Sequence, residues 1–150
     1  MSNIKGDLHK LCVSIIKGRI DTAQHSLDEL QQATENETKS SAGDKYETSR
    51  EMMQQETDRS MAILNEARKQ MVTLNMIGTN SSGELADNGS LVITDNGSFY
   101  LAISGGILEH NNQKYFAVST ASPVGARLKG KKAGEIVSFN NNTYRILEIV

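Results

Sequence analysis

Residues 1–77 carry two stretches with helical periodicity. In the second stretch, seam positions recur in alternating steps of three and four residues from position 46 to position 74, which is the spacing of one helix face. The first stretch has a comparable series over residues 4–30, and its register shifts once between Ile15 and Ile16, as a stutter would shift it. Each stripe is too narrow to be buried on all sides. The pattern therefore predicts two helices that pack against each other.

The two stripes match when the chain folds back on itself. That fold places Leu27 opposite Met53, and it collects the apolar pairs at the end away from the bend. The bend itself is predicted at residues 36–43, where asparagine, serine and glycine disfavour a helix interior. Because this break lies midway between stripes of matching length, an antiparallel hairpin fits better than a parallel coiled coil. Two arms of roughly 30 residues, at about 1.5 Å each, would reach about 45 Å.

The period changes after a linker. Residues 78–89 show no periodicity and contain turn formers, so they are predicted to connect two domains, residues 1–77 and residues 90–150. The second domain contains short runs rich in β-branched and aromatic residues, separated by tight-turn sequences. These runs are residues 91–94, 99–103, 107–110, 114–118, 135–139 and 143–149. The pattern predicts an antiparallel sheet of five or six strands, and hence an α+β fold.

One segment of the second domain has a helical start signal. Ser122 is a favourable cap, and Pro123 stands at the first helical position. Residues 122–128 are therefore predicted to form one or two helical turns over a face of the sheet. Four basic residues fall within six positions here, namely Arg127, Lys129, Lys131 and Lys132. Two interpretations stay open: a basic surface for an acidic partner or for phosphates, or a solvated loop.

Composition narrows the class of protein. The net charge is −2, hydrophobic residues make up 37% and aromatic residues 5%, so neither nucleic-acid binding through bulk charge nor one large core is expected. The sequence contains no run of about 20 apolar residues, so no membrane span is predicted. The polar first residues do not resemble a signal peptide. The lone Cys12 lies on the apolar side of the first helix, as a small buried hydrophobe in a reducing, cytoplasmic compartment would.

The segment from Ser122 to Val137, SPVGARLKGKKAGEIV, resembles the signature of the Gre family of bacterial transcription elongation factors, S-P-[LIV]-G-x-x-L-x-G-K-K-x-G-[DE]-x-V. The closing residues 144–149, YRILEI, are similar to that family's ending. The resemblance is strict over residues 122–149 and loose over residues 1–77. It implies an N-terminal antiparallel coiled-coil helical hairpin followed by a small FKBP-like antiparallel β-sheet domain with one short helix. The periodicity indicates the same architecture independently.

The resemblance also implies a function. Members of the family dock on RNA polymerase at the rim of its secondary channel, and their hairpin enters the pore. We expect Ser122, Pro123, Val124 and Gly125 to bind the polymerase, and the basic cluster to make a further contact. The protein would be an accessory factor rather than an enzyme. It would act as a monomer, hold no cofactor of its own, share Mg²⁺ with the polymerase and meet nucleic acid only within that complex.

A pair of acids stands at the predicted bend. Gly43-Asp44-Lys45-Tyr46-Glu47 has the G-D-x-x-E spacing of the family's hairpin tip, where two carboxylates help to hold the second Mg²⁺ and its attacking water. Asp44 and Glu47 are therefore the expected catalytic and metal-contacting residues. The same spacing is a capping box, in which Asp44 would merely begin the second helix. The two interpretations are compatible, since a capping residue can also face a metal.

The sequence departs from the family directly after the second acid. The family has Asn-Ala-Glu-Tyr there, whereas this chain has Thr48-Ser49-Arg50-Glu51. Some Gre-like paralogues bind the same channel and inhibit, or act without cleavage. Three hypotheses follow: a transcript-cleavage elongation factor, a non-cleaving secondary-channel regulator or inhibitor of RNA polymerase, and a helical-hairpin interaction module with another partner. The three histidines, His9, His25 and His110, share no metal-ligand spacing, so no further metal site is predicted.

Overall fold

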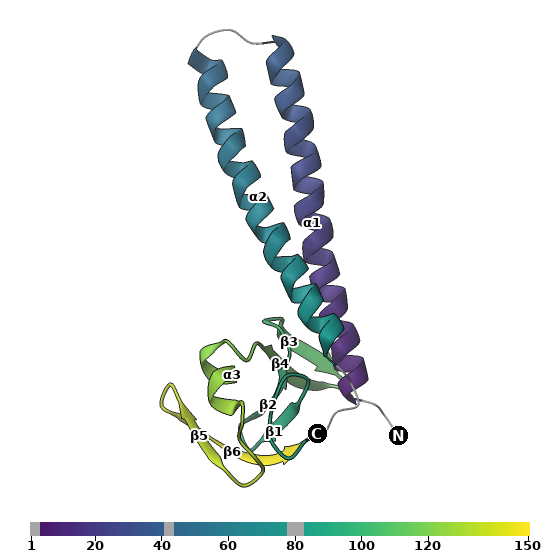
Figure 1. The fold of residues 1–150 in the computed structure, drawn as a ribbon, viewed down its shortest axis with the longest axis vertical. Helices are drawn as coiled ribbons and strands as arrows, with labels where there is room; N and C mark the ends of the chain where they lie inside the picture. Colours follow the sequence, from purple (N-terminus) through teal and green to yellow (C-terminus); the bar gives the residue numbers. More distant parts are fainter. Residues whose placement is uncertain (1–3, 41–43, 78–82) are drawn as a thin grey trace. The chain divides into compact units, whose positions relative to one another are not determined.

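The computed structural model describes residues 4–40, 44–77 and 83–150 (Figure 1). Its elements are α1 (Ile4–Ser40), α2 (Asp44–Met76), β1 (Leu91–Thr94), β2 (Gly97–Leu101), β3 (Gly106–His110), β4 (Gln113–Val118), α3 (Pro123–Leu128), β5 (Ile136–Phe139) and β6 (Asn142–Ile149). Two long helices followed by a sheet and a short helix confirm the predicted α+β fold class. The predicted bend was too long, because α1 continues to Ser40. No described helix combines the length and the apolar character that crossing a membrane requires.

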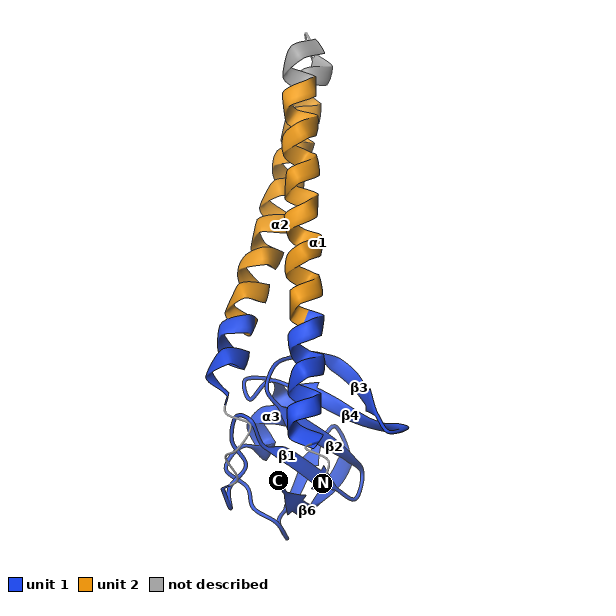
Figure 2. Ribbon diagram, turned by 90° about the vertical axis from the view of Figure 1, so that its right-hand side faces the viewer, with its two compact units in different colours: residues 1–15, 71–150 blue, residues 16–70 orange. Residues whose placement is uncertain are grey.

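The chain forms two compact units (Figure 2). The first unit comprises residues 1–15 and 71–150, and the second comprises residues 16–70. Both long helices therefore contribute to both units, whereas the sequence suggested a boundary after residue 77. Of the expected linker, residues 78–82 lie outside the described part. Farther along, Ala86 is buried, and its N–H donates a hydrogen bond to the Lys131 carbonyl oxygen at 2.7 Å, so this part packs within the first unit.

The six strands within residues 83–150 form one sheet in the order β3-β4-β2-β1-β6-β5. Neighbouring strands are antiparallel, except that β2 and β4 are parallel. Tight-turn signals did not predict the parallel pair, because they report only antiparallel strands that adjoin in sequence. The β3–β4 and β5–β6 hairpins turn at Asn111-Asn112 and Asn140-Asn141, all with positive φ, as two-residue turns matching the strand twist require.

One face of the sheet carries the core of the first unit, and α3 contributes to it. Leu128 of α3 is fully buried, and Val124 packs against the same cluster. The Phe99 ring stacks on Phe116 with centroids 5.4 Å apart and meets Tyr144 edge-on at 5.5 Å. The predicted helix over a sheet face is thereby confirmed. The buried cluster consists of Ala86, Val92, Phe99, Leu101, Leu128, Val137 and Ile146.

The opposite face of the sheet meets the first turns of α1. Successive strand residues point to opposite faces, so Tyr100 faces away from Phe99 and the cluster around it. The Nδ1 atom of His9 lies 3.2 Å from the Tyr100 hydroxyl oxygen. The Nε2 atom of His110 lies 2.8 Å from Oδ2 of Asp7. Within the first unit, these two contacts attach residues 4–15 of α1 to the sheet.

The second unit is an antiparallel helical hairpin, as the sequence predicted. Across the two helices, Nη1 of Arg19 donates a hydrogen bond to Oε1 of Gln70 at 3.2 Å. Nearer the bend, Oγ1 of Thr34 lies 3.4 Å from Sδ of Met53. The buried residues described in this unit are Ile16, Ala23, Ser60, Leu64 and Ala67.

The register of this hairpin differs from the predicted one. The sequence placed Leu27 opposite Met53, but the contact of Met53 is with Thr34, seven residues later. Seven residues are one heptad, so the same stripe of α1 faces α2 after the shift. The apolar pattern alone is therefore compatible with both registers. The continuation of α1 to Ser40 shortens the bend and selects the later register.

Candidate functional site

The predicted catalytic pair lies where α2 begins. Asp44 is the first residue of α2, and Glu47 belongs to its first turn. The Glu47 side chain is exposed, so its carboxylate is open to a partner. The side chains of residues 37–46, including Asp44, lie outside the described part. A joint site of the two carboxylates therefore stays a prediction, and so does the capping box.

Among the side chains that the structure describes, no group of three or more histidine, cysteine or carboxylate residues is arranged to hold a metal ion. His25 pairs instead with Glu29, whose carboxylate oxygen lies 3.0 Å from its Nε2. At the start of α2, the exposed Glu47 supplies carboxylate oxygen, the ligand type that Mg²⁺ prefers. A metal ion there would need further ligands from Asp44 and from a partner.

The first signature residues form a capped helical turn. Ser122 has extended dihedrals (φ −71°, ψ 158°), and its Oγ accepts a hydrogen bond from the Gly125 N–H at 3.1 Å. The same Oγ donates to the Ser119 carbonyl oxygen at 2.6 Å. Pro123 occupies the first turn. A backbone N–H there would have no partner within the helix, so proline loses no hydrogen bond. The predicted serine cap and proline start are confirmed.

Gly125 is required by a close backbone approach. A Cβ atom at this position would lie 1.9 Å from the Ser119 carbonyl oxygen, far inside contact distance, so no side chain fits. Val124 is half-buried against the core cluster, and Pro123 is exposed. Of the four residues predicted to bind polymerase, Pro123 therefore offers surface to a partner. Ser122, Val124 and Gly125 determine the shape of that surface.

Arg127 is held by residues of β5. Its guanidinium carbon lies 5.8 Å from the centre of the Phe139 ring, and Nη1 donates a hydrogen bond to the Ser138 carbonyl oxygen at 3.2 Å. A cation over an aromatic ring keeps its charge while losing side-chain freedom. Sequence reasoning missed Phe139, because it lies twelve residues after Arg127 and no motif marks it.

The three lysines of the basic cluster have different surroundings. Nζ of Lys129 lies 4.0 Å from Oδ1 of Asp87, at the limit of an exposed ion pair, which contributes little. Lys131 is half-buried and Lys132 is exposed. Gly130 between them has φ 83°, a conformation that glycine adopts without strain. Contact of this cluster with an acidic surface or with phosphates stays a prediction.

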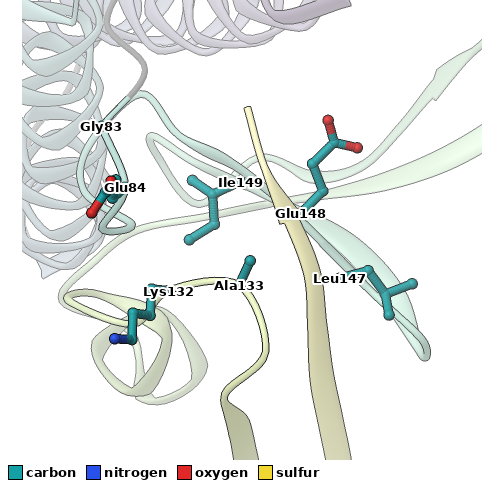
Figure 3. A pocket seen from close by; sticks show the side chains of 7 residues that line it. All are labelled: Gly83, Glu84, Lys132, Ala133, Leu147, Glu148 and Ile149. Carbon is teal, nitrogen blue, oxygen red and sulfur yellow. The ribbon is translucent and has the colours of Figure 1, made fainter.

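A cavity of about 340 Å³ opens beside β6 in the first unit (Figure 3). Figure 3 shows the apolar side chains of Ile149 and Ala133 close together in it. The lining residues include charged residues of both signs, so the cavity does not select a ligand of one charge. Sequence reasoning missed it, because its walls come from three segments far apart in the chain. The lining residues are Gly83, Glu84, Lys132, Ala133, Leu147, Glu148 and Ile149.

Burial shifts three ionisable groups in the part of the first unit where α1 meets the sheet. It raises the pKa of Tyr100 to about 12, with a second contribution from Cys12, and it lowers the pKa of His9 and of Lys5. Each shift favours the neutral form. Cys12 is fully buried, as the sequence predicted. These shifts share one cause, the burial of the side chains where α1 meets the sheet.

Comparisons with known proteins give a likeness to a solved structure. No protein-family model matches the chain, and no curated protein matches it either. The crystal structure of the GreA factor homolog 1 (Gfh1) protein of Thermus thermophilus is similar at 19% sequence identity and a TM-score of 0.39, over 92% of this chain and 94% of that chain.

Proposed function

We propose that this protein is an accessory factor of RNA polymerase that enters the secondary channel and stimulates cleavage of backtracked transcripts. The observation that carries the proposal is a long helical hairpin whose second helix starts at Asp44 and exposes Glu47 in its first turn. From Asp44 to Gln70, this helix spans about 40 Å at about 1.5 Å per residue. Such an arm carries a carboxylate into a pore that a globular body cannot enter.

The signature segment would supply the docking contact. Its turn is locked by the Ser122 cap and by the close approach at Gly125, which together hold Pro123 at the surface. Arg127, fixed over Phe139, lies one turn further along α3 and would add a positive charge. A rigid, pre-shaped turn loses little freedom when it binds, and this favours it as the polymerase-binding surface. In this proposal a monomer binds, and it meets nucleic acid only inside the complex.

At the hairpin tip, Asp44 and Glu47 would share a magnesium ion with the polymerase. The bound ion would supply Lewis-acid polarisation and a more acidic water. Glu47 would orient that water and accept a hydrogen bond from it. In the hydrolysis, the water oxygen bonds to phosphorus, the bond from phosphorus to the 3′ oxygen breaks, and that oxygen takes a proton. The polymerase performs the step, and this chain assists it.

The test is transcript cleavage in halted, backtracked elongation complexes. Wild-type protein should accelerate Mg²⁺-dependent cleavage, and Asp44→Ala with Glu47→Ala should abolish the acceleration while polymerase binding persists. The matched control is Asp58→Ala with Glu66→Ala, which removes two exposed acids farther along α2 and should leave cleavage intact. Binding without any acceleration by the wild type would reject the cleavage function.

A non-cleaving secondary-channel regulator is the second candidate. The observation that favours it is the exposed Arg50, which adds a positive charge one turn from Glu47. In that case the wild type would bind polymerase and change initiation or pausing, and the cleavage rate would equal that of polymerase alone. Removal of the two acids would then leave binding and regulation unchanged.

A further inference from the structure

Toward its bend, the helical hairpin has a seam that holds no buried residue. Over the described residues 24–36 and 47–59, every side chain is half-buried or exposed. Within residues 47–59, the half-buried side chains, which mark the seam of α2, are Ser49, Met53 and Thr57. Met53 is the apolar one of these three. Over the described residues 47–59, the apolar contribution of α2 to the seam therefore depends on one side chain.

The sulfur of Met53 lies against α1. Its Sδ atom is 3.4 Å from Oγ1 of Thr34, and the same hydroxyl donates a hydrogen bond to the Leu30 carbonyl oxygen at 2.8 Å. Because a thioether sulfur is a weak acceptor, the contact of Met53 with Thr34 is mainly a packing contact. Thr34 is exposed, so this contact lies at the surface of the hairpin. A small solute in water therefore reaches the sulfur without unfolding of either helix.

We propose that Met53 is a redox-sensitive modification site, at which a hydroperoxide oxidises the sulfur and the resulting sulfoxide loosens the hairpin toward its bend. With hydrogen peroxide, the sulfur lone pair attacks one peroxide oxygen, an S–O bond forms and the O–O bond breaks. Sulfur loses two electrons and the peroxide gains them. The departing hydroxide takes the proton of the transferred hydroxyl group and leaves as water. Methionine sulfoxide reductases reverse the modification.

The sulfoxide weakens the seam because it is polar. Oxidation converts a flexible apolar side chain into one with a strong hydrogen-bond acceptor, which favours water over the seam. No buried neighbour within the described residues 47–59 replaces the lost contact. Local opening of this part of α2 should therefore need less free energy after oxidation. Residues 60–70, which include the buried Leu64 and Ala67, should be unaffected.

The adjacent Met52 provides a matched control. Its side chain is 63% exposed, and successive residues on a helix do not share a face. Met52 therefore lies outside the seam, although it meets the same solvent and the same oxidant. Peroxide should oxidise both sulfurs, and the sulfoxide at Met53 alone should change the pairing of the helices.

The experiment treats the intact chain with hydrogen peroxide, assigns the oxidation to each methionine by peptide mass spectrometry and measures amide hydrogen exchange. In the wild type, oxidation should accelerate the exchange of residues 47–59 about fivefold, as expected from losing the burial of half a methionine side chain. Exchange of residues 60–70 should stay the same. Met52→Leu should respond like the wild type, and Met53→Leu, which keeps an apolar contact, should not respond.

Two further measurements separate the sulfoxide from general oxidative damage. Met53→Gln, which places a polar side chain of similar length in the seam, should show the faster exchange without any oxidant. Methionine sulfoxide reductases should restore slow exchange in the oxidised wild type. Equal acceleration in Met53→Leu, unchanged exchange once Met53 is oxidised, or a reduced Met53 after complete oxidation of Met52 would overturn the inference. None of these measurements uses polymerase, so their outcome is independent of the proposed function.

Discussion

The two halves of the helical hairpin unit differ in how they are packed. The near half, residues 16–23 and 60–70, contains all the buried residues that the structure describes in this unit. In the far half, residues 24–36 and 47–59, no described residue is buried. Helix geometry is the same in both halves, so the difference lies in the seam. Leu64 and Ile16 belong to the near half, while Thr34 and Met53 meet in the far half.

The two halves therefore have different roles: the near half stabilises the hairpin, and the far half offers side chains for contact with a partner. The near half buries apolar area, which is the main source of tertiary stability. The far half relies on its own helical hydrogen bonds and on exposed side-chain pairs, such as Gln54 with Asp58 at 3.0 Å, which each contribute only a few tenths of a kcal/mol. The exposed residues of the far half can therefore contact a partner at little cost to the stability of the fold.

The largest effect is expected from a leucine truncation in the near half. Leu64 is 2% exposed, so Leu64→Ala removes buried methyl groups and should lower the free energy of unfolding by about 2–5 kcal/mol. Leu27→Ala in the far half, where the side chain is half-buried, should cost about 1 kcal/mol or less. Urea unfolding followed by circular dichroism measures both. Equal losses would show that the two halves are packed alike.

An intermediate effect is expected in amide hydrogen exchange. Amides of residues 60–70 should exchange at least about tenfold more slowly than those of residues 47–59, because local opening needs less free energy where nothing is buried. Exchange measured by mass spectrometry on the intact chain resolves the two peptides. Uniform protection along α2 would contradict the comparison and would indicate one cooperative helix pair.

The smallest effect is expected from pH, and it should come from the first unit rather than from either half of the hairpin. Burial lowers the pKa of His9 below 6.5, so the unfolded chain binds a proton that the folded chain resists. The stability contribution of neutral His9 is present above pH 6.5 and is lost as the pH falls through the lower, folded-state pKa. The titratable groups in this region are Lys5, Asp7, Cys12, Tyr100 and His110.

The slope of stability against pH, measured by urea unfolding between pH 5 and pH 8, checks this prediction. His9→Gln should flatten that slope, because glutamine keeps a hydrogen-bonding group and does not titrate. The matched control is His25→Gln: His25 lies on the far half with 74% of its side chain exposed, and its replacement should leave the slope unchanged. If His25→Gln flattened the slope and His9→Gln did not, the pH dependence of stability would come from the hairpin.

Parts of the candidate site were readable from the sequence because their signals are local. The Ser122 cap and the Pro123 start depend on residues within one helical turn, and the structure has both. The close approach of Gly125 to Ser119 and the position of the Arg127 guanidinium over the Phe139 ring carry no local signal. Each requires two segments to meet in space, so only the folded chain reveals them.

Taken alone, the sequence determined the type and order of the elements: two long helices, short strands and a capped turn. Periodicity and turn chemistry act over a few residues, and that range suffices to choose helix, strand or turn. The tertiary structure decided the hairpin register, which a heptad repeat leaves degenerate, and the parallel pairing of β2 with β4. It also decided which residues of α1 attach to the sheet. These choices depend on which distant surfaces bury each other, a property that no short stretch of sequence contains.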